Sequence, residues 1–314
     1  MILAADIGGT RSRLGLGTLE GPFRLSRVEI LENAAFRSPK TLLKRYLSTL
    51  SEVPEMGVLA VAGPVQGRRA RLTNLGWKVD AGELERALGF PFFLLNDLEA
   101  AAYGLFKVPA SEVEKIKPGR RRGAVVAVLG VGTGLGEALL VRHFPLALAS
   151  EGGHAEYPVD TEEEWGLYRF LKGRFGHVSL ERVISGPGLS NVYAYFSGRE
   201  SSPEEILAAA RKGEREALSA VRLVVRALGR EASSLVLKAL ALSGVYLLGG
   251  LAQALRPWLD REFEEAFLAK GRLRELLEKV PVYLVRHPSP ALLGAALYGR
   301  ILRARLSAHF LPHT

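Results

Sequence analysis

The chain has 314 residues, 48% of them hydrophobic and 24% charged, which describes a globular protein of enzyme size and predicts two domains. It holds no cysteine, which excludes disulfides, a thiolate nucleophile and a Cys-based zinc site. It shows no targeting segment and no apolar run of membrane length, so a cytoplasmic location is expected.

The first predicted elements are two strands joined by a glycine turn. Residues 3–7 are apolar except for Asp6, the turn is Gly8-Gly9-Thr10, and residues 14–17 return as a strand. Glycines let backbone N–H groups converge on an anion and the threonine adds a hydroxyl, so this turn is a candidate phosphate loop. An unpaired carboxylate in a buried strand is costly, so Asp6 is expected to meet a cation, for which nucleotide-bound Mg²⁺ is a candidate.

The rest of the first hundred residues alternates strands and helices, which indicates α/β layering on a mixed sheet. Strands are expected near 23–30, 57–62 and 92–95, and helices near 40–50 and 97–106. Asn96-Asp97 stands where the last of these strands gives way to a helix, in the kind of loop that hosts ligands in α/β proteins. The alternative interpretation of Asp97 is a helix N-cap.

Residues 108–123 are rich in charge and are interpreted as a link between domains. They include the patch Arg120-Arg121-Arg122. Nucleic-acid binding is the alternative, but the patch is short and has no interleaved aromatic residues, which favours a solvated loop. The net charge of +9 is still expected to attract polyanionic ATP.

The second domain is predicted to open with a copy of the first hairpin. Strand 125–131 leads into the turn Gly132-Thr133-Gly134, and the chain returns as a strand through residue 141. The repetition favours two phosphate loops that grip one nucleotide over two ordinary hairpins. Neither turn matches the common P-loop or a complete dinucleotide fingerprint, so nicotinamide chemistry is disfavoured.

Two polar segments follow this hairpin. Glu151-Gly152-Gly153-His154 comes after the apolar residues 144–149 and predicts a tight turn that presents hydrogen-bonding groups to a polyhydroxylated ligand. Metal binding is the alternative, although no His-Glu-x-x-His pattern occurs. Glu181, taken alone, is expected in the first turn of a helix behind a Ser179 cap.

The C-terminal part predicts a long helix near 214–242, ended by Gly244. Its expected buried stripe is Leu218, Val221, Val225, Leu228, Leu235 and Leu240. A strand at 245–248 meets Gly249-Gly250, another follows at 282–285, and a final helix at 291–306 is expected to pack on the first domain. A ligand is expected in a cleft between the two domains.

Taken in order, these segments resemble the bacterial ATP-dependent glucokinases across nearly the whole chain. The matching segments are Asp6-Ile7-Gly8-Gly9-Thr10, Ala62-Gly63-Pro64-Val65, Leu95-Asn96-Asp97, Gly132-Thr133-Gly134-Leu135-Gly136, Glu151-Gly152-Gly153-His154, Ser185-Gly186-Pro187-Gly188-Leu189 and Leu248-Gly249-Gly250. Related zinc-containing sugar kinases and sugar-responsive repressors carry a cysteine cluster that this chain lacks, so no zinc site is expected.

The resemblance implies the actin-like, hexokinase-type fold: two ribonuclease-H-like α/β domains with mixed sheets and a cleft that closes on glucose. Residues 1–107 with 290–314 would form the smaller domain, and residues 108–289 the larger one. The implied activity is the glycolytic transfer of the ATP γ-phosphoryl group to glucose, with Mg²⁺, commonly by a homodimer and without a nucleic-acid or membrane partner.

The resemblance also implies a role for each site residue. Asp97 would be the catalytic base. The sugar hydroxyls would be held by Asn96, Asp97, Glu151, His154 and Glu181. The phosphates would lie against Asp6, with a water-bridged Mg²⁺, and against Gly8, Gly9, Thr10, Gly132, Thr133 and Gly134, and the adenosine against Gly249 and Gly250.

Some positions depart from the family pattern. Arg11 stands where the family usually has Asn, which predicts an added charge at the first loop. Ala149-Ser150 replaces a common Pro-Gly, and Leu75-Gly76 follows Asn74 where a His often stands. These departures leave open a broader hexose specificity. A sugar-responsive regulator and a filament-forming or chaperone-like ATPase of the same fold are the less favoured alternatives.

Overall fold

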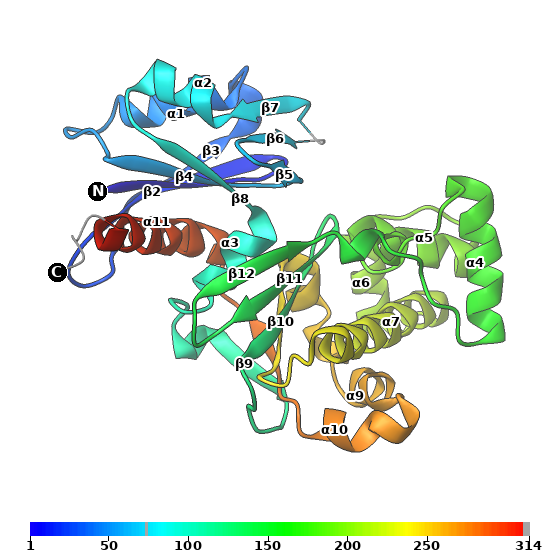
Figure 1. The fold of residues 1–314 in the computed structure, drawn as a ribbon. Coiled ribbons are helices and arrows are strands. Elements are labelled where there is room, and N and C mark those ends of the chain that lie inside the picture. The colour runs from blue at the N-terminus through cyan, green and yellow to red at the C-terminus, as the bar shows by residue number, and fades with distance from the viewer. Residues whose placement is uncertain (73–74, 310–314) are drawn as a thin grey trace. The chain divides into compact units, whose positions relative to one another are not determined.

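The computed structural model describes residues 1–72 and 75–309, with side chains through residue 305. Asn74 therefore lies outside the described residues. The chain forms two compact units (Figure 1). The first takes residues 1–109 and the C-terminal segment from His287, and the second takes residues 110–286.

The first unit is built on a five-stranded mixed sheet with the strand order β3-β2-β1-β4-β8. Its central strand pairs antiparallel with β2 and parallel with β4, and β4 pairs parallel with β8. A hairpin extension carries the small sheet β5-β6-β7. The strands are β1 (Ile2–Ile7), β2 (Arg11–Gly17), β3 (Leu25–Glu32), β4 (Met56–Val61), β5 (Val65–Gln66), β6 (Arg69–Leu72), β7 (Trp77–Asp80) and β8 (Phe92–Asn96).

Helices cover both faces of this sheet. On one face lie α1 (Pro39–Leu47) and α2 (Ala81–Leu88) (Figure 1). Buried residues of both helices share one core cluster with Leu3, Ala5 and Ile7 of β1. On the other face lie α3 (Asp97–Gly104) and α11 (Pro290–His309), so the last helix belongs to the first unit. These two helices cross closely at glycines: a Cβ on Gly294 would lie 1.6 Å from the Ala100 carbonyl oxygen.

The second unit repeats this topology. Its strand order β12-β11-β10-β13-β14 follows that of the first sheet, with an antiparallel neighbour on one side of β10 and a parallel one on the other. These strands are β10 (Val125–Val131), β11 (Leu135–Val141), β12 (Leu146–Ser150), β13 (Val245–Leu248) and β14 (Val282–Val285). The predicted α/β class with mixed sheets is confirmed.

A sixth strand corrects the interpretation of residues 108–123 as a link. Ala110–Glu112 form a 3-10 helix, and β9 (Val113–Lys117) pairs antiparallel with β14 at the sheet edge. The charges of Glu114 and Lys115 concealed this strand, because edge strands accept the charged residues that central strands exclude.

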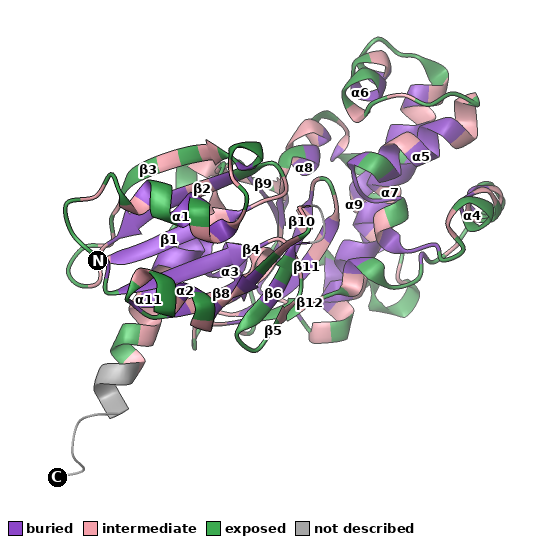
Figure 2. Ribbon diagram, turned by 90° about the horizontal axis from the view of Figure 1, so that it is seen from above, coloured by how far each residue is buried: buried purple, intermediate pink, exposed green. Residues whose placement is uncertain are grey.

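The long helix α7 (Arg215–Ala239) packs against β10 and carries the core of the second unit, which is buried together with the central strands (Figure 2). Most of its predicted stripe is in that core or against it, but Leu240 is 62% exposed. The predicted helix end at Gly244 is wrong, because Leu240 already adopts a left-handed φ of 47°.

The other helices are α4 (Glu162–Phe175), α5 (Gly186–Ser197), α6 (Pro203–Arg211), α8 (Gly250–Ala254), α9 (Arg261–Leu268) and α10 (Arg274–Glu278). In the described part of the chain, no helix has both the length and the apolar character needed to cross a membrane.

Candidate active site

One edge of the first sheet gathers the predicted site residues of that unit. The parallel strands β1, β4 and β8 end together, since Ile7 lies opposite Val61 and Val61 opposite Asn96. The turn Gly8-Gly9-Thr10 and the residues that follow β4 and β8 therefore emerge at the same edge. In α/β proteins, ligands bind at the carboxyl ends of the strands.

Asp6 meets a cation, and that cation is Arg13. The two residues lie opposite each other in the β1–β2 register, with 3.6 Å between Arg13 Nη1 and Asp6 Oδ2. The Asp6 side chain is 15% exposed, and burial raises its pKa, an effect that Arg13 partly offsets. A single carboxylate at this edge also fits Mg²⁺, which proteins usually hold through one or two carboxylates together with substrate phosphates.

Asn33 holds the first glycine turn in place, although no sequence pattern predicted a role for it. Asn33 is 1% exposed; its Nδ2 donates to the Gly8 carbonyl oxygen at 2.9 Å, and its backbone N–H donates to the Thr10 carbonyl oxygen at 2.8 Å. Its Oδ1 accepts from Ser12 Oγ at 2.6 Å. No local motif marks this asparagine, so only the tertiary contacts identify it.

Arg11, the departure at the first loop, is engaged by a neighbouring strand. Its Nε donates to Glu32 Oε1 at 2.6 Å, and both side chains are more than half exposed. The added charge is thus already paired with a carboxylate.

The helix that carries Asp97 is capped by Asn96, so the alternative interpretation of Asp97 as the N-cap is wrong. Asn96 Oδ1 accepts from the backbone N–H groups of Leu98 and Glu99, at 2.9 and 3.3 Å, and the Glu99 side chain completes a capping box. Asn96 Nδ2 donates to the Gly63 carbonyl oxygen at 3.2 Å. Asp97 is the first residue of α3, and its Oδ1 accepts from Leu98 N at 2.9 Å.

The corresponding edge of the second sheet carries the second glycine turn. Gly132 N donates to the Gly134 carbonyl oxygen at 2.9 Å, and the Gly132 carbonyl accepts from Gly186 N at 2.8 Å. Gly186 begins α5, so a helix N-terminus lies against the turn. Helix N-termini favour phosphate groups, and the sequence alone did not predict that this helix begins beside the turn.

Gly249 and Gly250 follow β13 beside the same turn. Gly249 has a φ of 100°, and a Cβ on it would lie 2.3 Å from the Val131 carbonyl oxygen at the end of β10. Only glycine satisfies both restrictions.

Glu181 lies against the second glycine turn. Its Oε2 accepts from Leu135 N at 3.0 Å, and a Cβ on Gly134 would lie 2.5 Å from that oxygen. The residue belongs to a three-residue 3-10 helix, Leu180–Arg182, and the expected Ser179 cap is wrong because the Ser179 side chain makes no capping bond.

The Glu151–His154 turn lies next to the Glu181 segment. Gly152–His154 form a 3-10 turn in which Glu151 Oε2 and His154 Nε2 are 3.8 Å apart and both side chains are about 60% exposed. Leu180 N donates to the Ala155 carbonyl oxygen at 2.9 Å, which joins the two segments. The second unit therefore brings Glu151, His154 and Glu181 together beside its glycine turn.

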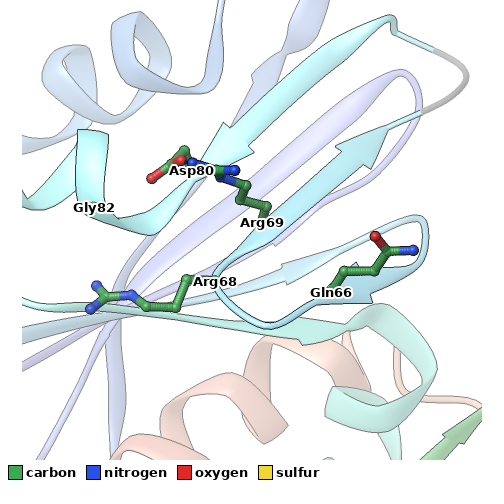
Figure 3. Close-up of a pocket in the computed structure, with 5 residues that line it drawn as sticks. All are labelled: Gln66, Arg68, Arg69, Asp80 and Gly82. Atoms are coloured by element: carbon green, nitrogen blue, oxygen red, sulfur yellow. Dashed lines mark hydrogen bonds and ion pairs between the residues drawn. The ribbon is translucent and has the colours of Figure 1, made fainter.

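The described residues hold no cluster of metal ligands, and the surface hollow of the first unit is lined by none of the predicted site residues. Within residues 1–72 and 75–309, no three His, Asp or Glu side chains gather as a ligand set for a metal ion. A surface hollow of about 420 Å³ in the first unit, lined by Gln66, Arg68, Arg69, Asp80 and Gly82, includes none of the predicted site residues (Figure 3). Its arginines are paired, Arg69 with Asp80 at 2.7 Å and Arg68 with Glu85.

The duplicated units and their paired glycine turns define a sugar kinase of the actin-like ATPase fold. The crystal structure of a glucokinase from an Antarctic psychrotroph matches with a TM-score of 0.84 and 33% identity, covering 95% of this chain and 98% of that one. The ROK hexokinase from Thermus thermophilus shares the fold with a TM-score of 0.72 at 22% identity, over 97% and 99% of the two chains.

A family model described as Glucokinase matches residues 3–301. The chain is 35% identical to the glucokinase of Stenotrophomonas maltophilia (strain R551-3), over 95% of this chain and 94% of the relative. It is 32% identical to the glucokinase of Trichormus variabilis, over 95% and 98%. The chain belongs to the glucokinase family and is an ATP-dependent hexose kinase.

Proposed function

We propose that this protein transfers the γ-phosphoryl group of ATP to the C6 hydroxyl of glucose, giving glucose 6-phosphate and ADP. The observation that carries the proposal is the position of Asp97. It directly follows β8, at the sheet edge that also carries Asp6 and the Gly8-Gly9-Thr10 turn.

Asp97 is proposed as the general base. Phosphoryl transfer needs a positioned nucleophile and a group that accepts its proton. The capping bonds of Asn96 fix the start of α3, and with it the backbone of Asp97. The Asp97 carboxylate then takes the proton of the C6 hydroxyl as that oxygen attacks the γ-phosphorus.

The two glycine turns are proposed to hold the nucleotide. Gly8, Gly9 and Thr10 would bind phosphate oxygens from one unit, and Gly132, Thr133 and Gly134 from the other, beside the N-terminus of α5. Gly249 and Gly250 would lie against the adenosine. Mg²⁺, when bound with ATP near Asp6, neutralises charge on the transferred phosphoryl group.

The sugar is proposed to bind Asn96, Glu151, His154 and Glu181. An amide group carries two N–H donors, so Asn96 Nδ2 keeps one for a sugar hydroxyl while the other goes to Gly63. A site built from such groups rejects an analogue that lacks one hydroxyl by ~10⁴ or more, because a buried polar group is then left unpaired.

Asp97→Asn tests the proposal in a coupled assay with ATP and glucose. The amide keeps the size of the side chain but cannot accept the proton, so we expect kcat to fall by ~10²–10⁴ while glucose binding largely survives. Asp80→Asn, which retains the N-cap of α2, is the matched control and should keep normal kcat. Near-normal turnover of the Asp97 variant would remove it from the role of base.

The range of sugars is a separate question, which the Glu151 turn raises. Ser150, one of the departures, accepts from Gly152 N through its Oγ at 3.0 Å, so this chain shapes the turn in its own way. A kcat/KM comparison of glucose, mannose, fructose and N-acetylglucosamine measures the breadth. We expect glucose to lead, and similar values for several hexoses would support the broader hexose kinase instead.

A further inference from the structure

The proposed mechanism uses neither of two neighbouring buried carboxyl groups, one of which lies against the Glu151–His154 turn. Glu137 of β11 is 1% exposed and Glu231 of α7 is 3% exposed. Each lies close enough to the other to shift its pKa. Among the described residues, the buried Glu137 Oε1 has no hydrogen-bond partner. Burial of two adjacent negative charges is unfavourable, so such a pair retains a proton.

Glu137 packs directly on the backbone of the turn. A Cβ added to Gly152 would lie 2.0 Å from Glu137 Oε2 and 2.8 Å from Glu137 Cδ. Glu137 also pairs in register with Ser150, whose Oγ accepts from Gly152 N. The position of this carboxyl group and the conformation of the turn are therefore linked.

The charges around the pair place the proton on Glu137. Lys238 Nζ lies 3.2 Å from Glu231 Oε1, and Lys270 also favours the ionised form of Glu231. Glu151 and His154 are the titratable side chains of the turn, and both are exposed and face each other. Burial, followed by the proximity of Glu231, raises the pKa of Glu137 to about 7, although Lys238 partly offsets this rise, and burial also raises the pKa of Glu231.

We propose that Glu137 is a positioning residue for the sugar: it shares a proton with Glu231 and, in that form, supports the Glu151–His154 turn in the conformation that binds the hexose. The proposal rests on the proposed function of this turn. Loss of the shared proton leaves two carboxylates side by side, and their repulsion displaces Glu137 from the position in which it supports the Gly152 backbone. The consequence is weaker hexose binding with unchanged phosphoryl transfer.

The test compares kcat and the KM for glucose between about pH 6 and 9 in the wild type and in Glu137→Gln. We expect the wild-type KM to rise about fivefold through pH 7, the size of effect expected for one hydrogen bond. The neutral amide of Glu137→Gln mimics the protonated carboxyl group, so its KM should stay low across this range. The titration of other groups affects both proteins and cancels in the ratio of their KM values.

A second variant and a control sharpen the comparison. Glu231→Gln removes the neighbouring negative charge, so the pH at which KM rises should move down. Glu265→Gln removes a carboxylate from an exposed pair with Arg261 in the same unit and should follow the wild type. Parallel KM profiles for the wild type and Glu137→Gln would overturn the proposal.

Unfolding experiments test the Glu137–Glu231 pair independently of enzyme activity. The folded chain holds the Glu137 proton more tightly than the unfolded chain, where the pKa is 4.5, so stability falls as the pH rises from about 4.5 to about 7. In Glu137→Gln, the free energy of unfolding should not show this dependence on pH. The same pH dependence in the wild type and the variant would contradict the shared proton. If no variant phosphorylates glucose while the pH dependences differ, the proposed function fails and the pair stands.

Discussion

At the scale of single residues, the polar side chains behind the first glycine turn matter as much as the turn. Asn33 is nearly inaccessible and bonds to the backbone at both ends of Gly8-Gly9-Thr10. These two bonds keep the turn in one conformation, which would lower the entropic cost of the proposed nucleotide binding.

Replacement of Asn33 should therefore affect both stability and ATP binding. We expect Asn33→Ala to lower the free energy of unfolding by about 1–3 kcal/mol, since it leaves the Gly8 carbonyl and the Ser12 hydroxyl without partners. The KM for ATP should rise more than the KM for glucose. Urea denaturation and steady-state kinetics measure the two effects, and an equal rise of both KM values would contradict a specific role at the phosphate loop.

The site could be predicted from the sequence only where the chemistry is local. The glycine turns and the Asn96-Asp97 pair are short, contiguous patterns, and the fold brings each set to one sheet edge. Arg13 and Asn33 could not be predicted, because their roles depend on contacts with residues on other elements. The catalytic and binding roles themselves stay predictions.

At the scale of elements, the capped start of α3 fixes the backbone position of Asp97, the first residue of that helix. Asn96 satisfies two backbone N–H groups of the helix and also ties it to the Gly63 carbonyl after β4. The cap uses the Oδ1 of this amide and the bond to Gly63 uses its Nδ2, so a mutation can remove one interaction without the other.

Two substitutions of Asn96 should give different losses of stability. Asn96→Ala removes both the cap and the hydrogen bond to Gly63, and we expect it to lower the free energy of unfolding by about 1–2 kcal/mol. Asn96→Ser keeps a good capping oxygen and loses only the donor to Gly63, so its loss should be smaller. Thermal or urea unfolding of both variants provides the measurement, and equal losses would mean that the cap contributes little.

Element boundaries show where sequence patterns mislead. Strands β1, β4, β10 and β13 were predictable because most of their residues are buried and their sequences are apolar, apart from Asp6 in β1. Strand β9 was not, since an edge strand is paired on one side only and carries charges that resemble a loop.

At the scale of the whole molecule, the net charge of +9 should act on one substrate more than on the other. ATP is a polyanion and glucose is neutral, so a positive field accelerates only the encounter with ATP. When ionic strength rises from about 10 to 200 mM, the Debye length falls to under ~10 Å, and we expect kcat/KM for ATP to fall severalfold. Glucose serves as the internal control, and an equal fall for both substrates would contradict electrostatic attraction.

The repetition of the α/β unit is a property of the whole chain, and it is visible both in the sequence and in the structure. Two glycine hairpins in the sequence correspond to two sheets with the same strand order and the same pattern of parallel and antiparallel pairs. The homodimer and the cleft between the domains stay predictions.

The sequence by itself determined the α/β class, the two glycine turns and the order of the family's motifs, because turn conformation and the succession of apolar segments depend on residues that are adjacent in the chain. Only the tertiary structure decided which side chains meet: Arg13 with Asp6, Asn33 with the first turn, Glu181 with the second, and Glu137 with both Glu231 and the Glu151–His154 turn. These contacts join residues that different strands and helices bring together. Their chemistry depends on burial, which exists only once the chain has folded.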